Sequence, residues 1–297
     1  IILIFITSIY IVTRRKNFHQ LAVSPDSFSQ PPILPPVVRS STSLYAHSGV
    51  LAFELKYKQE PHNLSIQLKM GVPVNLVKLT VPKLLPFFAT FVLYFVLATY
   101  DTRSELWSTI VKCAPIYSLI LFILLYGVSN TNPTYTYKIL VGLFFSSIGD
   151  LLLNINLFEL GVVAFAAAQV SFISAFGFQP RRWDIGLAMI TGSLAILGIL
   201  IGSISSTILR LGLPVYSLLL VTMAWRAVAR ASTEKRELPK ILGAIGGVLF
   251  VISDGFLAFN KFYTNIPYAV ILIMVPYYLA ECGIALSVVD YKYLPVQ

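Results

Sequence analysis

The chain has 297 residues, of which 57% are hydrophobic and only 12% are charged, and its mean hydropathy is +0.78. Soluble domains carry about 25% charged residues, so this composition excludes an ordinary soluble protein and indicates one embedded in a membrane. The formal net charge of +9 does not indicate a nucleic-acid partner, because the basic residues lie at the N-terminus and between apolar segments, where they set membrane topology.

The first part of the chain differs from the rest. An apolar run at residues 1–12 is too short to span a bilayer comfortably, and its charges follow it, unlike those of a signal peptide. Residues 17–69 are polar and include a cluster of prolines. We therefore expect residues 1–80 to be an N-terminal extension that is disordered or lies outside the native core, and residues 81–297 to form the membrane domain.

From residue 82 onward, long runs lack charge almost completely, and each is near the roughly 20 residues that a spanning helix needs. The pattern predicts an all-α polytopic membrane protein. The eight expected transmembrane helices are at about 84–100, 107–127, 138–156, 158–178, 184–203, 211–229, 240–260 and 267–288. Loops on one side carry most of the Lys and Arg residues, the densest from Arg226 to Lys240, and this bias predicts that both termini are cytosolic.

The two halves of the membrane domain repeat each other. The matches, in chain order, are PIYSLIL at 115–121 with PVYSLLL at 214–220, then Asp150, Leu153 and Asn156 with Asp254, Leu257 and Asn260, then Ala168-Gln169 with Ala280-Glu281. Each match is displaced by four helices, so the partners run in the same direction. A four-plus-four parallel internal repeat about an axis along the membrane normal is therefore predicted. The first and fifth helices show no match.

Asp150 and Asp254 lie well inside equivalent helices. A charge in the bilayer costs at least about 2.5–3.5 kcal/mol, so such residues usually face the bundle interior and mark a site, although an aspartate can also be buried there for packing alone. Two buried carboxyl groups close together should share one proton, which suits a general acid and a base or charge stabiliser. We expect the two to face each other in a cavity lined by Tyr117, Tyr216, Gln169 and Glu281.

Other polar residues could contact a substrate, and each has a structural alternative. Lys112 could bind a phosphate, pair with a buried acid, or extend to the lipid headgroups. Gln169 and Glu281 could orient water or a substrate group, or form interhelical hydrogen bonds. The candidate substrate-binding residues are Lys112, Tyr117, Gln169, Tyr216, Asn260, Tyr278 and Glu281.

No metal site and no cofactor is predicted. All three histidines lie before residue 63, and the two cysteines, Cys113 and Cys282, lie inside apolar segments. The hydrophobic body therefore lacks the ligands of a histidine zinc site and the residues of a Ser-His or Cys-His nucleophile. It also shows no glycine-rich phosphate loop and no nucleophile elbow.

The motifs resemble those of the lysoplasmalogenase-like (YhhN-type) family of integral membrane proteins, over roughly residues 84–290. The resemblance rests on the segments 112–115 (KCAP), 149–153 (GDLLL), 214–217 (PVYS), 243–254 and 277–280 (YYLA). It implies hydrolysis of the vinyl-ether bond of lysoplasmalogens, to a fatty aldehyde and glycerophosphocholine or glycerophosphoethanolamine, in the endoplasmic reticulum membrane. The family's functional aspartates match Asp150 and Asp254.

Two departures from the family pattern affect this expectation. Gln169 stands where the family pattern has histidine, and Glu281 stands where it has glutamine. The chemistry needs neither a metal nor a histidine, because a vinyl ether is cleaved by protonation to an oxocarbenium ion that water attacks, much as two carboxylates act in glycosidases. The alternatives are a proton-coupled membrane carrier, since duplicated halves and intramembrane acids are typical of carriers, and a non-catalytic lipid-binding protein.

Overall fold

The computed structural model describes residues 56–60, 63–67, 74–98, 105–126, 132–233 and 237–289. The chain divides near residue 80 into two compact units. In the N-terminal unit, β1 (Lys56–Glu60) pairs antiparallel with β2 (Asn63–Gln67), with Lys56 opposite Gln67 and Glu60 opposite Asn63. This hairpin was not predicted from the sequence, and residues 1–55 of the expected extension lie outside the described residues.

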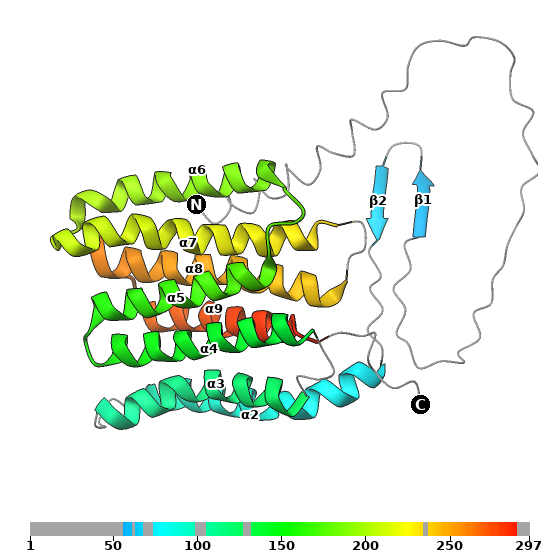
Figure 1. Cartoon of the computed structure of the whole chain (residues 1–297), viewed down its shortest axis with the longest axis horizontal. Coiled ribbons are helices and arrows are strands. Elements are labelled where there is room, and N and C mark those ends of the chain that lie inside the picture. The colour runs from blue at the N-terminus through cyan, green and yellow to red at the C-terminus, as the bar shows by residue number, and fades with distance from the viewer. Residues whose placement is uncertain are drawn as a thin grey trace, which may run out of the picture. The chain divides into compact units, whose positions relative to one another are not determined.

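The helices of the described part confirm the predicted all-α membrane fold. They are α2 (Val74–Ala98), α3 (Glu105–Tyr126), α4 (Pro133–Asn154), α5 (Phe158–Phe176), α6 (Trp183–Leu200), α7 (Thr207–Ala231), α8 (Leu238–Phe262) and α9 (Ala269–Leu286), with a short 3-10 turn after α6 (Figure 1). All eight are long and apolar enough to cross a membrane.

Three of these helices begin earlier than the hydropathy pattern predicts, each for a local reason. Helix α2 begins at Val74 rather than at 84, because it accommodates Pro82 and Pro86 within its length. Helix α4 begins at Pro133 rather than at 138, because the side chain of Asn132 accepts a hydrogen bond from the Tyr135 amide at 3.3 Å, and proline suits the first helical position. Helix α7 is capped in the same way by Ser206.

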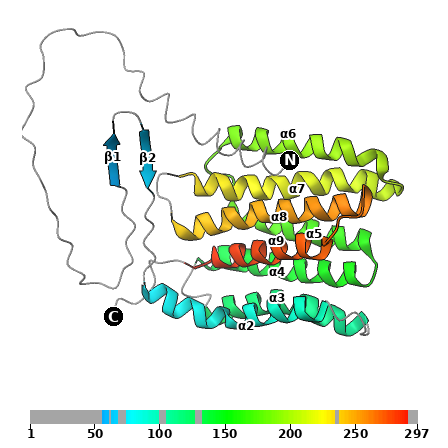
Figure 2. The same cartoon turned by 180° about the vertical axis from the view of Figure 1, so that it is seen from behind.

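The packing of the helices supports the predicted internal repeat. Helix α4 packs most extensively on α5, as α8 does on α9, and the pair α3–α4 corresponds to α7–α8. Helices α2 and α6 lie at opposite edges of the bundle (Figures 1 and 2). The hydroxyl groups of Thr90 in α2 and Ser118 in α3 lie 3.3 Å apart, as do those of Ser193 in α6 and Ser217 in α7. The correspondence thus reaches the first and fifth helices, where the sequence shows no match.

Equivalent glycines bring equivalent helices close together. At Gly142 in α4, an added Cβ would lie 2.2 Å from the ring of Phe172 in α5. At Gly246 in α8, it would lie 2.6 Å from the Ala280 carbonyl oxygen of α9 and 3.1 Å from the Ile284 side chain. The two glycines precede Asp150 and Asp254 by the same number of residues, so the helices that carry the aspartates are fixed by matching contacts.

We expect Gly246→Ala to destabilise the bundle, because its new methyl group meets the backbone of α9, which can yield only if the helices separate. Overpacking of this kind costs about 1–3 kcal/mol. The matched control is Gly198→Ala in α6, where nothing lies within 4 Å of the added Cβ and alanine is the better helix former. Thermal unfolding in detergent should show a lower Tm for Gly246→Ala than for wild type, whereas the Tm of the control should not fall. Equal Tm values for the two variants would contradict the close packing of α8 on α9.

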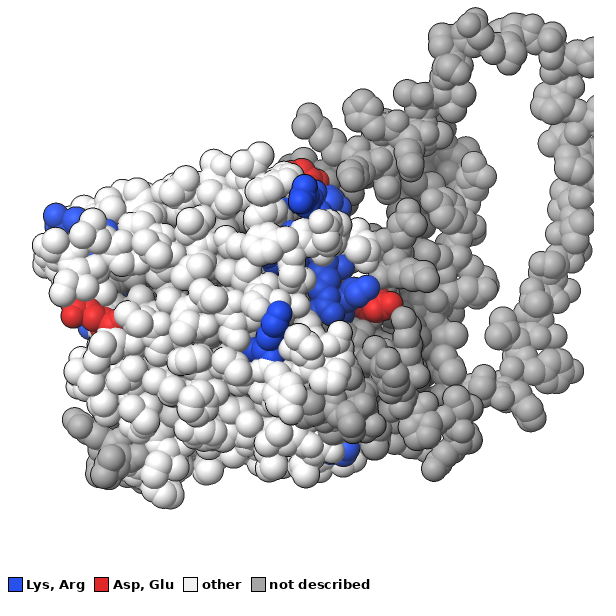
Figure 3. All heavy atoms as spheres, viewed as in Figure 1, with Lys and Arg blue, Asp and Glu red and all other residues white. Residues whose placement is uncertain are grey.

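Charged side chains gather at the ends of the helical bundle, and the visible face between them carries none (Figure 3). We call the end at which α4, α6 and α8 begin the basic end. Its described basic residues beyond α3 are Lys138, Arg181, Arg182, Arg226, Arg230 and Lys240. At the opposite end, the described basic residues after α3 are Arg210 and Lys261. Such an asymmetry of basic residues is typical of a membrane protein with a fixed orientation.

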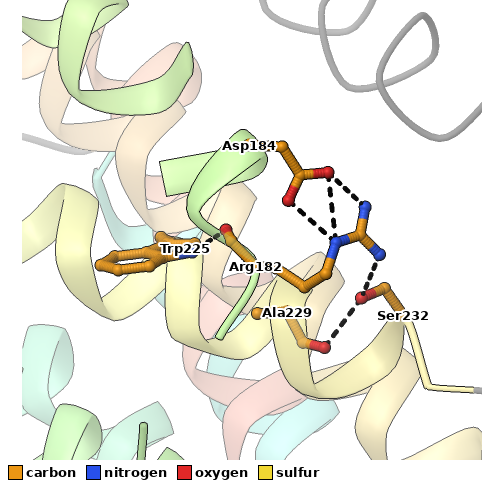
Figure 4. Close-up of polar contacts among 5 residues, drawn as sticks. All are labelled: Arg182, Asp184, Trp225, Ala229 and Ser232. Atoms are coloured by element: carbon orange, nitrogen blue, oxygen red, sulfur yellow. Dashed lines mark hydrogen bonds and ion pairs between the residues drawn. The ribbon is translucent and has the colours of Figure 1, made fainter. Parts of the chain in front are cut away.

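A polar cluster at the basic end joins α6 to α7. Arg182 forms an ion pair of 2.7 Å with Asp184 and donates a hydrogen bond of 3.0 Å to the Ser232 hydroxyl (Figure 4). Its carbonyl oxygen accepts a hydrogen bond from the Trp225 indole at 2.7 Å. Arg226 was counted among the loop charges although it falls within the helix predicted at 211–229. It is fully buried in α7 and donates to backbone carbonyls of the α5–α6 loop. These contacts anchor the loop to α7.

Candidate active site

Asp150 and Asp254 lie at matching depths in α4 and α8. From the first residues of these helices, Pro133 and Leu238, the rise of 1.5 Å per residue places each aspartate roughly 25 Å from the basic end. The helix starts expected from hydropathy, at 138 and 240, correspond to roughly 18–21 Å, so both aspartates lie farther from this end than predicted because both helices begin earlier. The site therefore lies in the half of the bundle opposite the basic end.

Asp150 is almost completely buried, with 2% of its surface exposed, and it has two polar partners. The ammonium group of Lys112 in α3 lies 3.3 Å from Oδ1, and the Tyr277 hydroxyl of α9 donates a hydrogen bond of 2.7 Å to Oδ2. Of the alternatives open for Lys112, the structure shows pairing with a buried acid. Because a nearby cation favours the charged form of a carboxyl group, this arrangement suits an aspartate that acts as an anion.

Asp254 has a different environment. It is partly buried, and its Oδ2 accepts a hydrogen bond from the Tyr216 hydroxyl of α7. Among the described residues, no cation forms an ion pair with it. Asp254 also lines a cavity of about 110 Å³ between α4, α5, α6, α7 and α8. The walls of this cavity are mainly apolar, with Leu153, Phe158 and Val251 among them.

A third acid lies near the two aspartates. The carboxyl group of Glu281 in α9 is close enough to those of Asp150 and Asp254 to interact with both electrostatically, and Asp150 and Asp254 interact with each other. Glu281 is fully buried, as is Gln169 in α5. The repeat therefore brings the polar residues of α4, α5, α8 and α9 into one region, as the sequence led us to expect.

The expected shared cavity is wrong in two respects. Asp254 and Tyr216 line the cavity, but Asp150, Gln169 and Glu281 do not. Tyr117 is 51% exposed and points to the outer surface of α3. The core-facing positions next to it are Ile116 and Leu119, both fully buried, so the motif that α3 shares with α7 does not place the two tyrosines in equivalent environments.

Two further candidates also lie outside the cavity. The Asn260 side chain accepts a hydrogen bond of 2.9 Å from the Ile266 amide and so shapes the loop between α8 and α9. The Tyr278 hydroxyl donates to the Lys112 carbonyl at 2.8 Å, and its ring packs against Phe91 and Tyr94 of α2. Both contacts hold helices or loops in place.

Tyr277 was not among the candidate residues, although its neighbour Tyr278 was. The spacing could have indicated it, because Tyr277 and Glu281 are four residues apart and therefore share a face of α9. Tyr277 is 3% exposed and packs edge-on against Phe165 and Phe250. These rings hold its hydroxyl toward Asp150.

Eight apolar helices that bury a cluster of carboxyl groups define a polytopic membrane protein with a polar site between its helices. Residues 107–288 match the model of the YhhN family. The chain is 37% identical to lysoplasmalogenase TMEM86A of Homo sapiens over 228 residues, which cover 74% of this chain and 94% of the relative. It is 34% identical to lysoplasmalogenase TMEM86B of Sus scrofa over 204 residues, which cover 68% of this chain and 84% of the relative. The chain therefore belongs to the YhhN family. No solved structure matches it.

Proposed function

We propose that this protein is a lysoplasmalogenase, which hydrolyses the vinyl-ether bond of 1-alkenyl lysophospholipids to a fatty aldehyde and glycerophosphocholine or glycerophosphoethanolamine. The names of its relatives support this activity. So does the apolar cavity beside Asp254, because it matches the alkenyl chain of such a substrate in polarity. The substrate reaches the site from the bilayer.

The observation that carries the proposal is the different environment of the two matched aspartates. Asp150 is paired with Lys112, whereas Asp254 faces an apolar cavity and has no cationic partner among the described residues. A cation favours the carboxylate and an apolar environment favours the neutral acid. Asp254 is thus the proton donor, and Asp150 is the anion that stabilises developing positive charge. Environments that separate two carboxyl groups in this way are typical of acid–base catalysis.

The reaction follows from these roles. Asp254 donates its proton to the distal vinyl carbon, and the double bond supplies the electron pair of the new C–H bond. The carbon attached to oxygen becomes an oxocarbenium ion, whose charge Asp150 stabilises. Water adds to this carbon and loses a proton to the Asp254 carboxylate. As the resulting hemiacetal breaks, Asp254 gives this proton to the leaving glycerol oxygen and takes up the hemiacetal hydroxyl proton, and the aldehyde is released.

The cellular setting is part of the proposal. We place the protein in the endoplasmic reticulum membrane, as the family resemblance implies. We place the basic end and both termini in the cytosol, since the basic residues of the described loops concentrate at that end. Residues 81–297 are the catalytic membrane domain.

The test is aldehyde release by the purified full chain in detergent micelles. The substrate is a 1-alkenyl lysophospholipid, and the matched 1-alkyl lysophospholipid, which lacks only the double bond, is the control. We expect aldehyde from the alkenyl substrate alone. If the folded protein releases no aldehyde, the proposed lysoplasmalogenase activity is wrong. Flux that appears only in sealed vesicles would indicate the carrier instead.

A further inference from the structure

A fully buried set of polar side chains near the aspartates lacks hydrogen-bond partners. Ser146 in α4, Gln169 in α5 and Glu281 in α9 are each 0% exposed. The Ser146 hydroxyl, both polar atoms of the Gln169 amide and both carboxyl oxygens of Glu281 make no hydrogen bond. Because a buried polar group without a partner is destabilising, five such atoms in one region indicate that something hydrogen-bonds them.

These groups form one cluster with the aspartates. Glu281 interacts electrostatically with Asp150 and Asp254, and Ser146 lies beside it. Gln169 lies beside Tyr216, whose hydroxyl binds Asp254. Neither of these neighbouring pairs has hydrogen-bond geometry, so the groups are near each other and still in need of a partner between them.

The chemistry of the cluster selects its ligand. A protonated carboxyl group, an amide and a hydroxyl each donate and accept hydrogen bonds. Water can satisfy this combination, and buried waters typically make about three hydrogen bonds to groups of this kind. An anion would be repelled by the nearby carboxyl groups. A metal ion has no site here, since no three acidic, histidine or cysteine side chains of the described part converge closely enough to hold one.

We infer that Glu281, Gln169 and Ser146 bind and orient the water that attacks the oxocarbenium ion. This inference rests on the proposed hydrolase function. Glu281 is buried without a cationic partner among the described residues, so it acts as a neutral carboxyl group. The water oxygen forms the new bond to the carbon, and one water proton passes to the carboxylate that Asp254 becomes when it protonates the vinyl carbon. Asp254 passes this proton to the glycerol oxygen as the hemiacetal breaks and regains one from the hemiacetal hydroxyl, so it ends in its starting state.

This role has a signature that a packing role lacks. Without an activated water, the oxocarbenium ion reverts to the vinyl ether by losing a proton from its distal carbon to Asp254. In D₂O, that carbon has first received a deuteron from Asp254. The bond to the oxocarbenium carbon is then a single bond, and when it rotates before reversal Asp254 removes the original hydrogen, so deuterium stays in the recovered substrate. When water attack is fast, the oxocarbenium ion goes on to aldehyde and the recovered substrate stays unlabelled.

The experiment compares wild type with Glu281→Leu, in detergent and in D₂O, using a 1-alkenyl lysophospholipid. We expect Glu281→Leu to lose roughly 10²-fold in turnover and to leave deuterium on the vinyl group of the recovered substrate. Gln169→Leu, which keeps the side-chain volume, should show the same label with a smaller loss, and it serves as the test if Glu281→Leu fails to fold. Glu281→Gln, whose amide can still hydrogen-bond the water, should keep most of the turnover.

Each result has a distinct meaning. Wild-type turnover in the folded leucine variants, or slow turnover in them with unlabelled recovered substrate, overturns the water site while leaving the hydrolase in place. So does a loss in Glu281→Gln as large as that in Glu281→Leu. A wild-type protein that releases no aldehyde overturns the hydrolase itself, and the water site with it.

Discussion

Replacing Asp254 with asparagine should remove nearly all aldehyde release, with a loss of about 10²–10⁴-fold in turnover. Asparagine keeps the shape and can still accept the hydrogen bond from the Tyr216 hydroxyl, but it has no proton to donate to the vinyl carbon. The cavity and the packing of α8 stay as they are, so the melting temperature in detergent should change little.

The matched control is Asp184→Asn at the basic end. Asp184 pairs with Arg182, and 40% of its side chain is exposed, so the substitution removes an aspartate far from the cavity. We expect its turnover to equal that of wild type. Full activity in Asp254→Asn, with aldehyde still released from the alkenyl substrate, would rule out Asp254 as the acid.

Lys112→Met should damage both catalysis and stability. The methionine fills the space of the lysine stem but leaves the Asp150 carboxylate, 3.3 Å from the lost ammonium group, without its cation. Breaking a buried ion pair in this way costs about 3–5 kcal/mol unless Asp150 takes up a proton. In either case Asp150 no longer stabilises the oxocarbenium ion as a paired carboxylate, and we expect turnover to fall about 10²–10³-fold.

A double substitution separates the two effects. In Lys112→Met with Asp150→Asn, both charges are gone, so the melting temperature should recover toward that of wild type while activity stays lost. Lys138→Met is the control, since that lysine donates to the Ser174 carbonyl in the basic-end half of α4. If Lys112→Met alone keeps normal activity and stability, the ion pair with Asp150 has no role in the site.

The sequence was informative about the fold where hydropathy and repetition decide it. Eight long apolar runs specify eight spanning helices, and the matched segments around Asp150 and Asp254 indicate how the halves correspond. Helix starts were less predictable, because they depend on single capping side chains such as Asn132 and on prolines that α2 tolerates. The Thr90–Ser118 and Ser193–Ser217 contacts could not be anticipated, since they repeat a geometry without repeating a sequence.

The burial of the acidic residues could be predicted from the sequence, but their hydrogen-bond and ion-pair partners were harder to predict. An aspartate inside an apolar helix is costly to expose to lipid, so it faces the interior of the bundle. A tyrosine is stable both on a lipid-facing surface and in a protein core. Tyr117 and Tyr216 occupy matching sequence motifs, yet one faces outward and the other binds Asp254. The pairing of Asp150 with Lys112 and Tyr277 joins three helices, and sequence spacing does not reveal contacts of that kind.

The most direct test of the proton transfer is the isotope content of the product. The purified wild-type chain, equilibrated in D₂O, is given a 1-alkenyl lysophospholipid, and the aldehyde is trapped at once as a hydrazone for mass spectrometry. If an acidic side chain protonates the distal vinyl carbon, the aldehyde carries one deuterium on the carbon next to its carbonyl group. Aldehyde without deuterium at that carbon would contradict the mechanism.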